Sequence, residues 1–145
     1  MINLNTKERY LLEDEKSQEE LCVSKYNEYA SRANCNELKN LFSSLAQKEQ
    51  EHLDSINQLL NGTIPNTNAG GGQSQNQQMG GSSSAPTMQN NTPVLSYDEN
   101  DKKLCQDSLA TEKYVSSTYN TAIFEFRDKN IRQVLNHIQK EEQEH

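Results

Sequence analysis

Residues 49–52 read EQEH, and the same four letters recur at residues 142–145. Both copies place a glutamate three positions before a histidine, so in a helix the two side chains lie on one face about one turn apart. From there they could bind one ion from the same side. Apolar residues around each copy recur in steps of three and four, which is typical of a helix that packs along one face. The stretch therefore predicts helices that carry an ion-binding pair on a packed face.

The two copies belong to two similar halves of the chain. Shifting the second half back by 93 positions aligns it with the first half without a gap. An internal duplication is the simplest explanation, and it predicts the same local fold in both halves. Pairs that are identical under this shift include Leu11 and Leu104, Asp14 and Asp107, Glu19 and Glu112, Ser24 and Ser117, Tyr26 and Tyr119, and Asn27 and Asn120.

The periodicity predicts two helices in each half. The residues expected on the packed faces of the first half are Leu12, Glu15, Glu19, Cys22, Tyr26, Tyr29 and Ala33, followed by Leu38, Phe42, Leu45, Glu49, His52, Ile56 and Leu59. In the second half they are Cys105, Ser108, Glu112, Val115, Tyr119, Ala122 and Phe126, followed by Ile131, Leu135, Ile138, Glu142 and His145. Capping signals agree with this division. They are Asn5 with Glu8, Ser96 with Glu99, Asn36 and Asp128 as helix starts, and Gly62 as a helix stop.

Between the halves lies a tract rich in Gly, Ser, Asn and Gln, at residues 62–95, which predicts a flexible linker. The expected parts are a first hairpin at 5–61, this linker, and a second hairpin at 96–145, together forming one bundle domain. A helix of about 25 residues is roughly 37 Å long, and a flexible linker of about 34 residues typically spans roughly 32 Å. The linker could therefore cross the whole molecule. We expect an all-α four-helix bundle of two antiparallel hairpins with one long crossover.

Polar residues stand on the packed faces where the rhythm calls for Leu or Ile. Glu19 precedes Glu49 by 30 residues, Glu112 precedes Glu142 by 30, and both midpoints fall in predicted turns. Folding each hairpin there brings its glutamate level with its Glu-x-x-His pair. Buried carboxylates are normally paired, protonated or bound to metal, so we expect two divalent cations, with carboxylate bridges and one histidine per metal. The ligands would be Glu19, Glu49, His52, Glu112, Glu142 and His145.

A single Glu-x-x-His match more often lies on a solvated helix face, so the prediction of a metal site depends on the duplication and on the midpoint turns.

Tyr26 and Tyr119 lie about two turns beyond Glu19 and Glu112 on the same faces. Their hydroxyls could donate hydrogen bonds to ligand carboxylates, or the rings could simply fill the core. His137 lies off the packed face and is expected at the surface.

Other residues limit the classes of function. A net charge of −7 disfavours binding to nucleic acid or to anionic membranes. The N-terminus lacks the apolar stretch of a signal peptide, and no segment has the length of a membrane span. Cys22 and Cys105 are expected as small core residues, whereas Cys35 falls in a predicted turn as an exposed thiol. Glu15 is expected near a bundle end, within reach of solvent.

Both halves resemble the Coat F spore coat proteins of endospore-forming Firmicutes, of a clostridial type, and the segment from Thr111 to His145 is the most specific. The resemblance implies a ferritin-like fold and a place in the endospore coat, assembled from the mother-cell cytoplasm. The ligand pattern also resembles those of bacterioferritin, rubrerythrin and manganese catalase, which implies a dimetal centre of Fe or Mn. Leu109 stands where rubrerythrins place a further carboxylate, and no rubredoxin-like cysteine cluster is present. Rubrerythrin-type peroxidase activity is therefore disfavoured.

Two functions remain open from the sequence. One is a structural coat component that packs against other spore coat proteins and could also form a homo-oligomer. The other is a dimetal oxidase, or a manganese-catalase-like enzyme that removes peroxide. Iron storage would need a closed cage, which nothing in the sequence predicts. We also expect the second hairpin to be truncated at its C-terminus, because its last helix would need two or three more turns to match the first.

Overall fold

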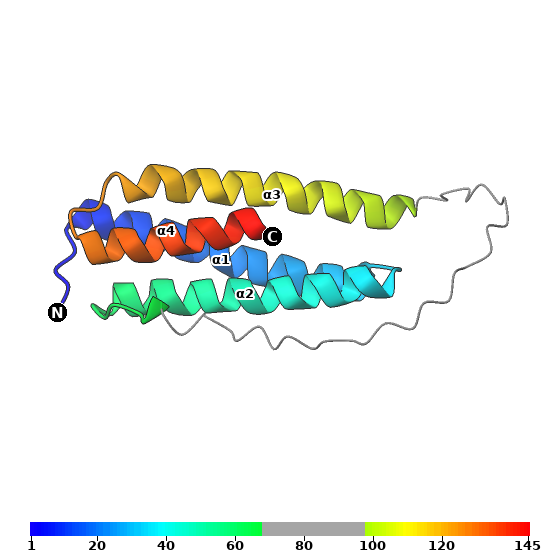
Figure 1. The fold of residues 1–145 in the computed structure, drawn as a ribbon, viewed down its shortest axis with the longest axis horizontal. Helices are drawn as coiled ribbons and strands as arrows, with labels where there is room; N and C mark the ends of the chain where they lie inside the picture. The colour runs from blue at the N-terminus through cyan, green and yellow to red at the C-terminus, as the bar shows by residue number, and fades with distance from the viewer. Residues whose placement is uncertain (68–97) are drawn as a thin grey trace, which may run out of the picture.

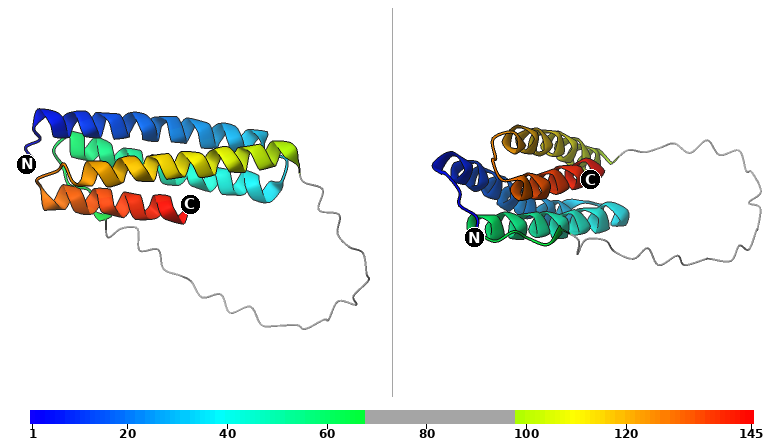
Figure 2. Two further views of the ribbon diagram at one scale, coloured as in Figure 1. Left: turned by 90° about the horizontal axis from the view of Figure 1, so that it is seen from above. Right: turned by 60° about the vertical axis from the view of Figure 1, so that its left-hand side comes forward.

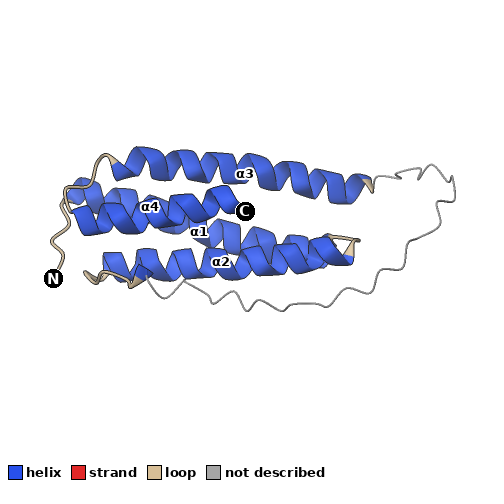
Figure 3. Cartoon of the chain, viewed as in Figure 1, coloured by secondary structure: helices blue, strands red, loops and turns tan. Residues whose placement is uncertain are grey.

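The computed structural model describes residues 1–67 and 98–145, and no strand occurs in these two ranges (Figure 3). The prediction of an all-α chain with two helices in each half is confirmed there. The helices are α1 (Thr6–Arg32), α2 (Asn36–Leu60), α3 (Glu99–Ile123) and α4 (Lys129–Glu144).

The four helices lie side by side along the length of the molecule (Figures 1 and 2). α1 and α2 form one antiparallel hairpin, and α3 and α4 form another. α2 ends and α3 begins at opposite ends of the molecule, so the chain between them has to cross its length. The linker predicted for residues 62–95 lies outside the described residues from position 68 onward.

Three of the predicted helix signals are present as expected. The Asn5 side chain accepts a hydrogen bond from the Glu8 amide at 2.8 Å, and the Glu8 carboxylate accepts one from the Asn5 amide at 2.9 Å, which completes a capping box. Asp128 caps α4 by accepting from the Asn130 amide at 2.7 Å. Gly62 follows the end of α2 with a φ of +83°, a left-handed conformation that glycine adopts without steric cost.

The other two helix starts differ from the prediction. The N-cap of α2 is Cys35, not Asn36, and its side chain makes no capping hydrogen bond. Asp101 of α3 binds the turn just before α2, where its carboxylate accepts from the Asn34 and Cys35 amides at 2.8 Å each. The N-cap of α3 is Asp98, which accepts from the Asp101 amide at 3.1 Å. The predicted cap Ser96 lies outside the described residues.

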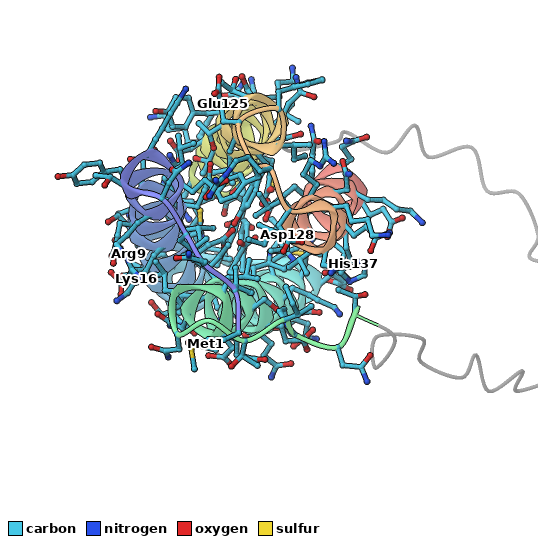
Figure 4. All side chains as sticks on the ribbon, turned by 90° about the vertical axis from the view of Figure 1, so that its left-hand side faces the viewer. Met1, Arg9, Lys16, Glu125, Asp128 and His137 are labelled. Atoms are coloured by element: carbon cyan, nitrogen blue, oxygen red, sulfur yellow. The ribbon has the colours of Figure 1, made fainter. Side chains whose placement is uncertain are left out.

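Side chains fill the space between the four helices, as the end-on view shows (Figure 4). The core holds apolar side chains along its length, with a group of polar ones at mid-height. Its apolar members that have no exposed surface include Leu12, Tyr26, Ile56, Leu59, Tyr119 and Leu135. The packed faces predicted from periodicity are therefore mostly the buried faces.

Two predictions about burial were wrong. Cys105 is exposed, because Leu104 occupies the inward position at that turn of α3. Glu15 is buried, with 2% of its surface exposed, because Thr118 of α3 packs over it and its hydroxyl lies 3.2 Å from the Glu15 carboxylate. Cys22 is buried and Cys35 is exposed, as predicted. His137 lies on the outer side of α4 (Figure 4), where its side chain is 37% exposed.

Candidate metal centre

The six residues predicted as metal ligands converge at mid-height in the core. Every helix contributes to the cluster, and His145 directly follows α4. Their ligand atoms form two overlapping groups, within each of which the atoms lie no more than 4.8 Å apart. One group is Glu19, Glu49, His52 and Glu142, and the other is Glu49, Glu112, Glu142 and His145. These buried carboxylates and imidazoles could hold metal ions.

Glu49 and Glu142 belong to both groups, and each turns one oxygen toward each histidine. Nδ1 of His52 lies 2.8 Å from Oε1 of Glu142 and 3.5 Å from Oε2 of Glu49. Nδ1 of His145 lies 3.1 Å from Oε1 of Glu49 and 3.8 Å from Oε2 of Glu142. The two imidazole rings are stacked, with centroids 5.7 Å apart. This is the arrangement in which a carboxylate can bridge two cations.

Glu19 and Glu112 each belong to one group only. Oε2 of Glu19 lies 3.9 Å from Nδ1 of His52, and Oε1 of Glu112 lies 3.4 Å from Nδ1 of His145. Each of these carboxylates accepts a hydrogen bond from a tyrosine of the other hairpin: Tyr119 donates to Glu19, and Tyr26 donates to Glu112. Of the two interpretations of these tyrosines, the structure supports the one in which the hydroxyls hold the carboxylates.

The unpaired polar atoms of the cluster fit a metal centre. Among the described residues, the buried side-chain atoms without a hydrogen-bond partner all belong to the six residues of the cluster. They are Oε2 of Glu19, both oxygens of Glu49, Nδ1 of His52, Oε2 of Glu112, both oxygens of Glu142 and Nε2 of His145. Burying polar atoms without partners costs free energy that coordination would recover. Four carboxylates with two neutral imidazoles also match the charge of two divalent cations.

The pKa values of the cluster residues show that the four carboxylates need positive charge nearby. Burial raises the pKa of Glu142 to about 8, and burial together with Glu49 raises the pKa of Glu19 well above its usual range. Burial alone would lower the pKa of His52, but the carboxylates of Glu141, Glu142 and Glu49 around the ring raise it to about 12. Burial likewise opposes the protonation of His145, but Glu112 and Glu49 raise its pKa to about 9. Protons on the imidazoles then offset the carboxylate charge.

Glu141 extends the cluster toward the surface, and periodicity did not reveal it. Its Oε2 lies 2.8 Å from Nε2 of His52, on the side of the ring that faces away from the cluster. Its Oε1 lies 3.5 Å from Nε2 of His137 and 3.8 Å from Nζ of Lys48. The hydrogen bond to His52 holds the pKa of Glu141 near 2, so this carboxylate is ionised. The only sequence signal was its place beside the ligand Glu142.

A cavity of about 730 Å³ between α2 and α3 reaches the cluster from the side of Glu112 and His145. Its lining is largely apolar, and it includes Tyr26, Leu45 and Leu109. Glu112, Glu142 and His145 also line it, whereas Glu19 and His52 do not. α2 and α3 extend past the end of α4 at this place (Figure 1).

Comparison with known protein families gives one match. Residues 100–145 match the family model of the Coat F domain. The matched segment contains Glu112, Glu142 and His145, while the other three cluster residues precede it in the chain. No curated protein and no solved structure matches the chain. No helix in the described residues is long and apolar enough to cross a membrane.

Proposed function

We propose, from the Coat F domain at residues 100–145, that the protein is a structural component of the endospore coat with a ferritin-like bundle and a carboxylate-bridged dimetal site. The observation that carries the metal site is that Glu49 and Glu142 each turn their two oxygens to different histidines. Glu19 with His52 would complete one metal position, and Glu112 with His145 would complete the other. Fe or Mn suits these carboxylate and imidazole ligands.

The ferritin-like arrangement is supported by contacts that repeat under the shift of 93 positions. Tyr26 donates to Glu112, and their equivalents Tyr119 and Glu19 make the matching contact. Two hairpins that pack in this reciprocal way, joined by a connection across the whole molecule, have the topology of one-crossover bundles. One glutamate and one Glu-x-x-His set from each hairpin is also the ligand set of ferritin-like dimetal proteins.

Bound metal ions would stabilise the bundle and could supply redox chemistry toward peroxide. The protein's own side chains have separate tasks. Glu49 and Glu142 join the two positions, and the hydroxyls of Tyr26 and Tyr119 restrain the outer carboxylates. The apolar residues above and below the cluster exclude water, which strengthens every charge interaction between them.

The second candidate function is a dimetal oxidase or a manganese-catalase-like enzyme. The two adjoining ligand groups favour it, because a pair of redox-active ions held there could exchange electrons with peroxide. The structural function needs no such chemistry. Partners in the structural case would be other spore coat proteins or further copies of this chain.

Metal content and peroxide turnover together distinguish the two functions. We expect purified protein incubated with Mn²⁺ or Fe²⁺ to retain two ions per chain after gel filtration, as measured by plasma mass spectrometry. Glu49→Ala and Glu142→Ala should each lose both ions, because each carboxylate serves both positions. Glu144→Ala, at an exposed position on α4, is the matched control. Circular dichroism establishes that the variants remain folded.

The outcomes lead to different conclusions. Two ions without peroxide turnover would support the structural function, and two ions with turnover that Glu49→Ala abolishes would support the enzyme. Wild-type protein that retains no metal would refute the dimetal site and leave only the coat assignment. Protein that is absent from isolated coats, as tested by immunogold labelling of spores, would refute that assignment.

A further inference from the structure

We infer that the two metal positions are unequal, and that Glu141 makes the position of Glu19 and His52 the tighter of the two. This inference rests on the proposed function, because it concerns the same cluster. It starts from the outer nitrogens of the two histidines. Both rings turn Nδ1 toward the carboxylates, so in both rings Nε2 is the atom left to meet the surrounding protein.

The two outer nitrogens have different surroundings. Nε2 of His52 lies 2.8 Å from the Glu141 carboxylate. Nε2 of His145 is buried and has no hydrogen-bond partner among the described residues. The shift of 93 positions, which superposes the cluster residues of the two halves, places Lys48 where the second half has Glu141. A lysine ammonium has no lone pair and cannot accept a hydrogen bond from an imidazole.

The contacts of Glu141 allow it to hold the His52 ring in one orientation. One oxygen faces His137 and Lys48 at the surface, and the other is left for His52. An imidazole that donates Nε2–H to a carboxylate keeps Nδ1 free as the ligand atom, and its basicity increases. Loss of such an outer partner typically weakens metal binding by about 10- to 100-fold. Glu141 is therefore a positioning residue that acts through His52.

The histidine of the other position has no such partner among the described residues. We conclude that the position of Glu112 and His145 has the lower affinity and fills second.

Titration of the apoprotein with Co²⁺, followed by isothermal calorimetry and by visible absorption, tests this inference. The wild type should bind two ions with affinities that differ by about tenfold or more. Glu141→Ala should weaken the tighter step by about 10- to 100-fold and leave the weaker step unchanged, so that the two steps merge. Glu144→Ala, at an exposed position of the same helix, should reproduce the wild-type curve.

A second measurement tests whether the tighter binding step involves His52. Co²⁺ bound through Nδ1 should shift the Nε2–H proton of His52 far outside the normal range in the proton NMR spectrum. In the wild type this signal should survive in water because Glu141 protects it from exchange, and it should broaden in Glu141→Ala. Two equal affinities in the wild type, or equal weakening of both steps in Glu141→Ala, would refute the inequality while leaving the dimetal site intact. No Co²⁺ binding at all would refute both.

Discussion

Glu15 lies in the core one turn before the ligand Glu19 on α1, and the hydroxyl of Thr118 lies 3.2 Å from its carboxylate. Burial raises its pKa to about 8, against an ordinary value of 4.5. The carboxyl group is thus more easily ionised in the unfolded chain than in the folded one. Folding is undisturbed below pH 4.5, and its free energy becomes less favourable as the pH rises from there toward 8.

Glu15→Gln removes this titration and keeps the size and the hydrogen-bonding oxygen of the side chain. The variant should match the wild type at pH 4.5 and be more stable by about 3 kcal/mol at pH 8.5. Urea unfolding of both proteins in EDTA at the two pH values measures the difference. Glu20→Gln, at an exposed position on the same helix, is the control. Equal stability of Glu15→Gln and the wild type at pH 8.5 would contradict this explanation.

Residue periodicity identified that Glu15 belongs to a packed face but misjudged its surroundings. Periodicity shows which side of a helix faces a neighbour, and it does not show which residue of another helix covers that position. The same limit explains Cys105, where two adjacent residues compete for one inward position and Leu104 occupies it. Glu141 was missed because its contact with His52 crosses from α4 to α2.

At the scale of helices, each hairpin holds the turn of the other. Glu8 of α1 accepts hydrogen bonds from the backbone amide and the guanidinium of Arg127, in the turn between α3 and α4, at 3.1–3.2 Å. Asp101 of α3 accepts from the amides of Asn34 and Cys35, in the turn between α1 and α2. The shift of 93 positions converts one contact into the other. These long-range contacts fix the relative height of the two hairpins.

The Glu8 contact predicts an acid-sensitive contribution to stability. Its hydrogen bonds with Arg127 lower the pKa of Glu8 from 4.5 to about 2. The stabilisation is complete above pH 4.5 and is lost as the pH falls toward 2. Because Arg127 is exposed and screened by solvent, Glu8→Gln should cost only about 1–2 kcal/mol at pH 7.

At pH 2 the wild-type carboxylate is about half protonated in the folded protein and almost fully protonated in the unfolded chain, so the same substitution should cost only about a few tenths of a kcal/mol. Thermal unfolding of the wild type, Glu8→Gln and the exposed control Glu13→Gln at both pH values measures this. A deficit in Glu8→Gln that stays constant between pH 7 and pH 2 would show that Glu8 acts through packing and not through its charge.

Local signals in the sequence predicted the helices better than their starts. The capping box of Asn5 and Glu8 needs only residues three apart, and it was predicted correctly. α2 begins without a side-chain cap, and the turn before it is held by Asp101, more than 60 residues along the chain, so no local pattern could reveal this start. Asn36 was therefore the wrong choice of cap, although its helix was correct.

At the scale of the whole molecule, the cluster couples metal binding to protons. The pKa values of about 12 for His52, about 9 for His145 and about 8 for Glu142 mean that metal ions must displace protons at neutral pH. Metal affinity should therefore rise between pH 6 and pH 9. Calorimetric titrations with Mn²⁺ in two buffers of different ionisation enthalpy count the protons released at each pH. Affinity that does not change with pH, without proton release, would contradict this coupling.

The convergence of the six residues could be predicted because it depends on numbers that the sequence contains. The spacings of 30 residues within each half and 93 between the halves set the height of every ligand once the turns are placed. How the carboxylates divide between the histidines is not contained in those spacings. It depends on side-chain packing among all four helices, which only the structure shows.

Anomalous diffraction from crystals of the Mn-loaded protein tests the central claim most directly. We predict two strong peaks inside the bundle. Both should lie about 2.0–2.2 Å from oxygens of Glu49 and Glu142, one also near Glu19 and His52 and the other near Glu112 and His145. An empty core, with manganese only on surface carboxylates, would contradict the claim.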